Sequence, residues 1–306
     1  MMVLLVQRLG QLAFVLLALT VLIFGLMHLS GDPVALMAGE GATLADLERV
    51  RERMGFDQPV HVQYLRYMTG LLRGDLGTSV RQHRPVATLV LERVPATLQL
   101  TVLAQLMAVL VAFPVGVVSA IWRNSVFDRA AMAAAVFAQA IPVFWFGIML
   151  ILVFSVGLRW TPVGGRTGTF ALVLPVITLS AVFVAQNARL IRSSLLEVMS
   201  LDFVRTARSK GVSERSVIFR HAMRNALIPV VTILGLQFSN LLSGAVVTEM
   251  VFAWPGLGRL LVQAVLGRDV PLVLGSTIMI AAVVVFINLI VDLLYGVIDP
   301  RVRAES

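Results

Sequence analysis

The chain has 306 residues, of which 58% are hydrophobic and only 14% are charged. Soluble domains contain roughly a quarter charged residues, so this composition indicates an integral membrane protein and excludes an ordinary soluble domain. The net charge of +8 does not indicate nucleic-acid binding, because apolar runs of about 20 residues leave no room for a folded, water-exposed basic module.

The first predicted element is a membrane-spanning helix near the N-terminus, at residues 9–29. This apolar run is longer than the roughly 7–15 residues of the core of a secretion signal, and no small-residue cleavage motif closes it. We therefore expect residues 1–29 to form the first transmembrane helix.

A long polar loop follows at residues 30–95, with equal numbers of acidic and basic residues. Within it, the segment TLADLERVRERMGF begins at Thr43, a candidate N-cap, and carries apolar residues at helical spacing. The segment PVHVQYLRYMTGLLRG predicts a second amphipathic helix, with Pro59 at its start and Gly74 past its end. We expect an extracytoplasmic loop with short amphipathic helices, acting either as a solvated cap or as a ligand-contacting element.

Five further apolar runs are long enough to cross a bilayer core of about 30 Å. They lie at residues 96–121, 130–156, 170–190, 228–251 and 272–297. Three prolines fall inside these runs (Pro114, Pro142 and Pro175), where neighbouring helices and water can satisfy the freed carbonyl groups. The sequence therefore predicts an all-α polytopic membrane protein with six transmembrane helices, of which residues 96–306 form a five-helix core.

The distribution of basic residues predicts the orientation of these helices. With the N-terminus inside, the cytoplasmic segments hold 13 lysines and arginines, whereas the two short outer loops hold four. The long loop is left out of this comparison because long loops cross the membrane largely regardless of charge. The positive-inside rule therefore puts both termini in the cytoplasm.

A basic polar block, RTARSKGVSERSVIFRHAMRN, separates the fourth and fifth runs and contains seven basic residues and one acid. Asp202 can begin a helix that ends near Ser209 or Lys210, with Gly211 as a left-handed stop. Ser213 then caps a second short helix, which Glu214 favours at its positive end. An anchor for anionic lipid is one interpretation of the block. Its length and its own helix boundaries favour the other interpretation, a docking surface at the cytoplasmic face.

Polar side chains also recur on one face of the fifth run, with a shorter stripe on the second run that ends at Gln105. Polar groups are costly in hydrocarbon, so these faces should turn toward protein or a watery path. Helix packing through small and polar residues is the equally open alternative. The candidates for a translocation path are Gln105, Gln237, Asn240, Gly244 and Thr248.

Several motifs together resemble an inner-membrane permease subunit of the peptide branch of ABC importers, which handles dipeptides, oligopeptides, glutathione and nickel chelates. The similarity covers the whole chain. It rests on GDP at residues 31–33, MGFDQPV at 54–60, GDLGTS at 74–79, HAMRNALIPVV at 221–231, VFAWPGLGRL at 251–260 and DLLYGVIDPRVR at 292–303.

The resemblance implies that the cytoplasmic loop at residues 191–227 docks into a groove of an ATPase subunit. The glutamate-alanine-alanine, three residues, glycine pattern of the family falls on Arg205, Thr206, Ala207 and Gly211, with arginine in place of the glutamate. An ion pair of that glutamate is therefore not carried over. The coupling residues that we expect are Asp202, Arg205, Thr206, Ala207, Lys210, Gly211, Ser213 and His221.

The resemblance also implies the type I ABC importer permease architecture and import of di- or oligopeptides, or of related solutes such as glutathione, across the inner membrane. Implied partners are a second homologous permease, two ATPase subunits, an extracytoplasmic solute-binding protein and membrane lipid. The chain contains no phosphate-binding loop motif, so ATP and Mg²⁺ belong on the partner subunits, and we expect no cofactor and no metal on this chain.

Two other classes of function are compared with this one. An ion-coupled secondary transporter should show inverted repeats and a charged residue near the membrane midplane, and the sequence indicates neither. A membrane-embedded enzyme needs a clustered set of catalytic side chains. The four histidines are dispersed and cysteine is absent, so we expect a transport subunit rather than an enzyme.

Overall fold

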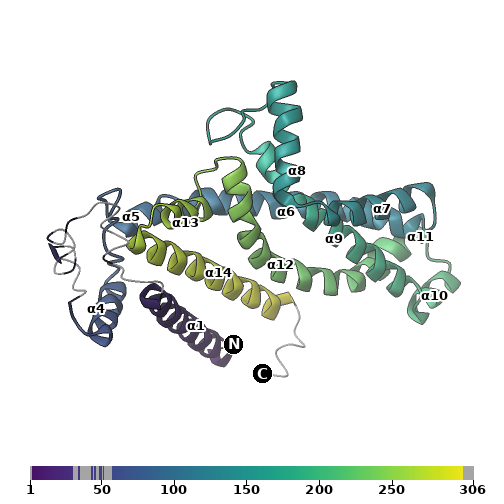
Figure 1. The fold of residues 1–306 in the computed structure, drawn as a ribbon. Helices are drawn as coiled ribbons and strands as arrows, with labels where there is room; N and C mark the ends of the chain where they lie inside the picture. Colours follow the sequence, from purple (N-terminus) through teal and green to yellow (C-terminus); the bar gives the residue numbers. More distant parts are fainter. Residues whose placement is uncertain are drawn as a thin grey trace. The chain divides into compact units, whose positions relative to one another are not determined.

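The computed structural model of the chain describes residues 2–29 and 57–298, with a few single residues between these two stretches. In the described stretches every named element is helical, as the sequence predicts. In chain order the elements are α1 (Met2–Leu29), α4 (Val60–Leu72), α5 (Val86–Leu91), α6 (Val94–Ile121), α7 (Val126–Ala140), α8 (Val143–Leu150), the π-helix η1 (Ile151–Gly157), α9 (Val173–Met199), α10 (Asp202–Ser209), α11 (Glu214–Ser216), the π-helix η2 (Val217–Ala222), α12 (Met223–Val251), α13 (Leu257–Leu266) and α14 (Val270–Ile298) (Figure 1).

Four helical stretches among the described residues are long and apolar enough to cross a membrane. They are Val86–Ile121, Val173–Met199, Glu214–Val251 and Val270–Val291. A fifth candidate is the pair formed by α7 and Val143–Gly157, whose two parts are bent by 105° relative to each other.

The run at residues 130–156, predicted as one membrane span, is therefore divided into two helical parts by this bend. Ile141 has an extended backbone, with φ −81° and ψ 127°, and Pro142 follows it as the N-cap of α8. A proline disfavours the helical conformation of the residue before it, which explains the end of α7 at Ala140. Pro114, in contrast, lies inside α6. Pro175 lies in the first turn of α9, where its missing N–H costs no helical hydrogen bond.

The chain divides into two compact units. The first contains the described residues up to Thr97 together with Pro255–Leu289, and its core joins α5, α13 and the start of α14. Within this unit the predicted second loop helix is α4, which packs against α1: the Phe24 ring lies 5.4 Å from that of Tyr64, and the hydroxyl groups of Thr20 and Tyr64 are 2.9 Å apart. The predicted first loop helix falls mostly outside the described residues.

The second unit contains Leu98–Trp254 together with Ile290–Ile298. Its core joins small residues of α6 to α9, and Gly116 marks the closest approach. A Cβ atom at Gly116 would lie 2.7 Å from the Ala188 carbonyl oxygen and 2.8 Å from the Ile191 Cβ, so a larger residue does not fit there. Val204 of α10 and Val217 of η2 are fully buried in the same core. The polar block is therefore packed onto the ends of the long helices rather than attached by a free tether.

Candidate functional site

The polar block folds as two short helical pieces that meet at a glycine. Helix α10 begins at Asp202 and ends at Ser209, as the sequence predicts. Gly211 follows with φ +76°, a conformation that glycine adopts without a steric penalty. Its N–H donates to the Arg208 carbonyl, and the N–H of Val212 donates to the Ala207 carbonyl, which is the Schellman pattern of helix termination.

Glu214 joins the second piece of the block to the first. Its carboxylate accepts from Arg208 twice, at 3.0 Å from Nε and 2.6 Å from Nη2. This hydrogen-bonded carboxylate raises the pKa of Arg208. Because both side chains are about half exposed, the pair contributes little to stability, but it links α10 to α11 across the glycine turn. The sequence predicts Glu214 only at the start of a helix and does not indicate this pair.

The two faces of α10 differ sharply. Val204 is fully buried in the core of the second unit, and Ala207 packs against that core as well. Ala207, one of the coupling residues expected from the sequence, therefore packs against its own chain. The exposed side of the helix and its ends carries Leu201, Phe203, Arg205, Thr206, Ser209 and Lys210. We call these six residues the α10 face.

Three coupling residues expected from the sequence have modest roles in the isolated chain. The Asp202 carboxylate lies 3.4 Å from Arg205, and both side chains are exposed, at 94% and 77%. Ser213 occupies the N-cap position of α11, but its hydroxyl makes no capping hydrogen bond. His221 lies half-buried on η2, where its carbonyl oxygen accepts from the Asn225 amide.

The candidate path residues of α12 separate into two groups. Gln237 is buried and its Nε2 lies 3.3 Å from Oε1 of Gln186 on α9. A Cβ atom at Gly244 would lie 3.3 Å from Leu179 of α9, and Thr248 is fully buried. Gln237 and Gly244 therefore lie in the contact between α9 and α12, whereas Asn240 is exposed.

Gln105 lies half-buried on α6. In the described part of the chain its buried Oε1 has no hydrogen-bond partner. The structure does not bring it together with the α12 residues by any hydrogen bond.

An ion pair that the sequence analysis missed joins α7 to α9. Asp128 is 2% exposed, and its two carboxylate oxygens accept from Nε and Nη2 of Arg192 at 2.6 and 2.7 Å. The backbone N–H of Asn124 donates to the same carboxylate. One sequence signal was present: Ser125 followed by Asp128 is a capping-box spacing, and Ser125 does accept from the Asp128 N–H. Nothing local indicates a partner 64 positions away.

Comparison with known proteins identifies the family. The family model described as "Binding-protein-dependent transport system inner membrane component" matches residues 112–304. The chain belongs to this family. The model of the N-terminal part of such membrane components matches residues 1–101, so this family of inner-membrane transport components accounts for nearly the whole chain.

Named relatives agree with the family over almost their full length. The chain is 45% identical over 298 residues to the glutathione transport system permease protein GsiC of Salmonella paratyphi A, with 97% of each protein covered. It is 40% identical over 333 residues to the dipeptide transport system permease protein DppB of Escherichia coli, with 98% of each covered. The ion-coupled secondary transporter, the alternative raised by the sequence, finds no support in these relatives.

Solved structures confirm the fold at lower identity. The chain matches an inward-facing structure of the MetNI methionine ABC transporter with a TM-score of 0.55 and 18% identity, over 69% of this chain and 96% of the other. It matches an amino acid ABC transporter crystallised with histidines with a TM-score of 0.53 and 19% identity, over 70% and 94%. The fold is therefore that of ABC importer membrane components, and the chain is a permease subunit rather than an ATPase.

Proposed function

We propose that the chain is one of two homologous permease subunits that together carry short peptides, glutathione included, across the inner membrane. The substrate class rests on the relatives, which are glutathione and dipeptide permeases. The chain crosses the membrane six times, with both termini in the cytoplasm and residues 30–95 outside. Two ATPase subunits bind and hydrolyse ATP with Mg²⁺, and an extracytoplasmic binding protein delivers the transported solute.

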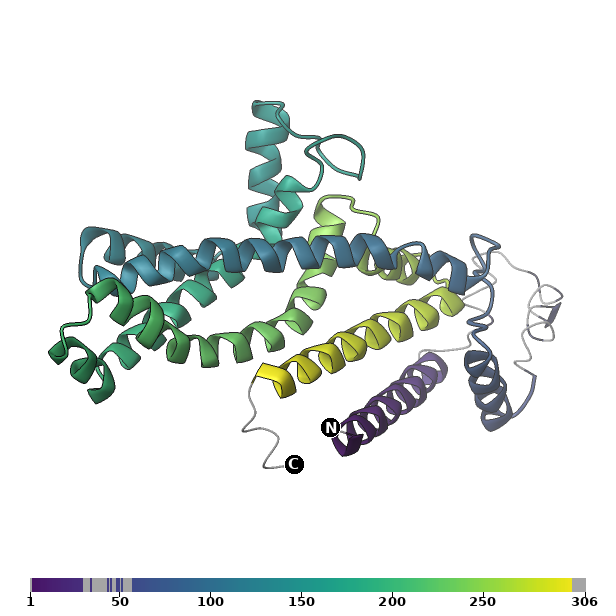
Figure 2. The same cartoon turned by 180° about the vertical axis from the view of Figure 1, so that it is seen from behind.

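The α10 face is the surface on which an ATPase subunit docks. The observation that supports this best is a partly exposed aromatic ring on a short polar helix: Phe203 is 41% exposed and Leu201 is 46% exposed. Aromatic anchors surrounded by polar residues are typical of the centre of a protein interface. Figures 1 and 2 show α10 and α11 together at one end of the second unit, next to the start of α12.

Packing explains how movement of a docked subunit reaches the transmembrane helices. Val204 of α10 shares one buried core with Ala112 and Val117 of α6 and with Ala188 and Ile191 of α9. A close-packed core transmits a displacement instead of absorbing it. Val204 of α10 and Val217 of η2 are both fully buried in this core, so α10 moves with the ends of the long helices.

Truncation of the exposed ring tests the docking surface. Phe203→Ala should weaken the affinity of the permease pair for its ATPase subunits by about 10- to 30-fold, the effect of losing a central aromatic anchor. The affinity is measured by titrating purified ATPase onto permease in nanodiscs. Trp122→Ala is the matched control, because Trp122 is also an exposed aromatic residue, 61% exposed, but lies in the α6–α7 turn. Equal affinity for both variants and the unaltered protein would refute the assignment of the α10 face.

A further inference from the structure

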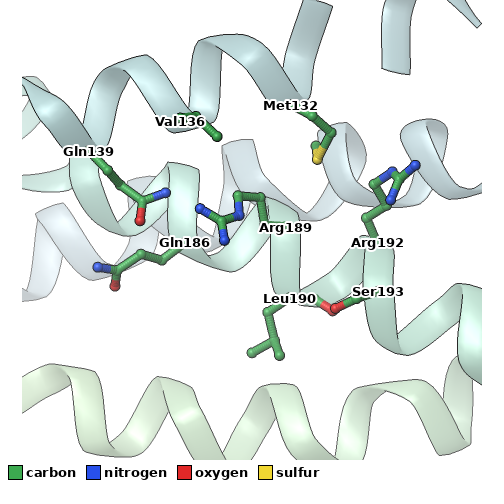
Figure 3. Close-up of a pocket in the computed structure, with 8 residues that line it drawn as sticks. All are labelled: Met132, Val136, Gln139, Gln186, Arg189, Leu190, Arg192 and Ser193. Carbon is green, nitrogen blue, oxygen red and sulfur yellow. The ribbon is translucent and has the colours of Figure 1, made fainter. Parts of the chain in front are cut away.

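A pocket of about 570 Å³ lies between α7 and α9, within the second unit. Its size suits a small organic molecule, for which binding pockets span about 300–1,000 Å³. The residues that line it are Met132, Val136 and Gln139 of α7 and Gln186, Arg189, Leu190, Arg192 and Ser193 of α9 (Figure 3). Two of these residues also make contacts described above: Gln186 with Gln237, and Arg192 with Asp128.

The two arginines of this pocket differ in their charge balance. Arg192 is neutralised by Asp128, to which it makes two hydrogen bonds. No ion pair joins Arg189 to an acidic side chain in the part of the chain that the structure describes. The pocket therefore carries one positive charge that the described residues do not balance.

The position of Arg189 on α9 makes this charge informative. Arg189 lies ten residues before Met199, the last residue of α9, which is about 15 Å along the helix axis. The whole of α9 is one candidate membrane span. Arg189 is exposed and lies three residues, about one helical turn, before Arg192, which pairs with Asp128 in the first turn of α7. A guanidinium near the end of an apolar helix that faces an open pocket is available to an anionic ligand. The sequence analysis placed the end of this span at residue 190 and so assigned Arg189 to its cytoplasmic edge.

Two amide side chains flank the free guanidinium. Figure 3 shows the Arg189 guanidinium extending toward the Gln139 amide, with the Gln186 amide farther along the same side of the pocket, while Arg192 points away from both. Gln186 accepts a hydrogen bond at Oε1 from the buried Gln237 of α12, which holds its amide and leaves its Nε2 donor for another acceptor. Gln139 donates to the Ala135 carbonyl, which leaves its Oε1 as an acceptor.

We propose that this pocket binds the carboxylate of the transported peptide during its passage through the permease. Arg189 and the Gln186 amide donate to the carboxylate oxygens, because a guanidinium fork matches a carboxylate in geometry and charge. Gln139 accepts from an N–H group of the peptide, and the apolar side chains of Met132, Val136 and Leu190 contact its aliphatic part. Because Arg189 is the one guanidinium that binds the carboxylate, the affinity of the site is low and the peptide can leave it, as transport requires. The proposal rests on the proposed function.

Direct binding to the complete permease–ATPase complex tests the site. The complex is assembled without the binding protein in nanodiscs of phosphatidylcholine, and the probe is radiolabelled glutathione. Arg189→Gln should weaken its binding by about 10- to 100-fold, the usual effect of losing a hydrogen bond to a charged group. Arg189→Lys, which keeps the charge, should recover part of the affinity. Arg123→Gln, an exposed arginine of the α6–α7 turn, is the matched control and should leave the affinity unchanged.

Two further arms separate the sources of an anionic group. Glutathione with both carboxyl groups amidated should bind equally weakly to the unaltered complex and to Arg189→Gln, because the proposed contact is to a carboxylate. If adding phosphatidylglycerol to the nanodiscs displaces glutathione only when Arg189 is present, both anions use the same site, and the guanidinium contact is confirmed. The opposite result would be that the complex retains phosphatidylglycerol only when Arg189 is present, while the affinity for glutathione does not depend on Arg189. That result would assign the pocket to lipid and overturn the proposal.

Uptake separates failure of this proposal from failure of the proposed function. Proteoliposomes containing the whole importer should take up glutathione at a rate that Arg189→Gln lowers and Arg123→Gln does not. Uptake that is normal in both variants would overturn the pocket assignment alone. Absence of glutathione and dialanine uptake in the unaltered importer would overturn the proposed substrate class, and the pocket assignment with it.

Discussion

The Asp128–Arg192 pair allows the sharpest prediction about stability. Asp128→Asn preserves the size of the side chain and removes its charge. The replacement loses two charge-assisted hydrogen bonds and brings an amide N–H toward the Arg192 guanidinium. Hydrogen bonds to charged groups contribute about 1.5–3 kcal/mol each, and removal of one partner of a buried ion pair costs about 3–5 kcal/mol.

The expected cost is at the lower end of this range. Arg192 is 23% exposed, so its guanidinium recovers some hydration after the replacement. We expect a loss of about 3 kcal/mol in the free energy of unfolding. This corresponds to a fall in melting temperature on the order of 5–10 °C.

The assay is thermal unfolding of the detergent-purified chain, followed by its tryptophan fluorescence. Asp202→Asn is the matched control, because Asp202 is 94% exposed and its replacement should change the free energy by less than about 0.5 kcal/mol. The double variant Asp128→Asn with Arg192→Gln should be more stable than Asp128→Asn alone, because it no longer contains a guanidinium that has lost its carboxylate partner. Equal melting temperatures for Asp128→Asn and Asp202→Asn, or additive losses in the double variant, would refute the reasoning.

Three other predictions follow from particular contacts. Asp269→Asn should increase proteolysis within residues 73–85, since the buried Asp269 carboxylate accepts from the Val80 and Arg81 backbone in this segment; an unchanged digestion pattern would contradict it. Gln82→Cys should react with an impermeant thiol reagent added outside intact cells, and Ser209→Cys only after the inside is exposed; the reverse pattern would overturn the proposed orientation. Gln237→Leu, in the contact between α9 and α12, should lower thermal stability, which is measured by the melting temperature; a stable variant with lowered uptake would instead place Gln237 on the path.

The polar block shows which features can be predicted from local sequence. The bounds of α10 follow from Asp202 at its start and Gly211 just past its end, and both act through hydrogen bonds within a few residues. The second loop helix, α4, follows from Pro59 and Gly74 in the same way. Such signals depend on backbone geometry alone, so they need no knowledge of the rest of the fold.

The bend at Pro142 and the Asp128–Arg192 pair could not be predicted from local signals in this way. Pro114 lies inside a helix and Pro142 ends one, although both occur in long apolar runs. The rule that a proline disfavours helix in the preceding residue holds at Ile141 and not at Phe113, so this local signal alone does not separate the two cases. In the sequence, Asp128 and Arg192 are each a charged residue near the predicted end of a helix. The pairing becomes evident only because α9 extends to Met199. The pocket around Arg189 was missed for the same reason.

ATP-dependent uptake by a reconstituted importer tests the central claim most directly. The measurement uses proteoliposomes that contain this permease, its homologous partner permease and both ATPase subunits, with the binding protein outside and radiolabelled glutathione or dialanine as cargo. We predict accumulation that requires ATP and stops when the ATPase subunits are omitted. Accumulation driven by a proton or sodium gradient in the absence of the ATPase subunits would contradict the account.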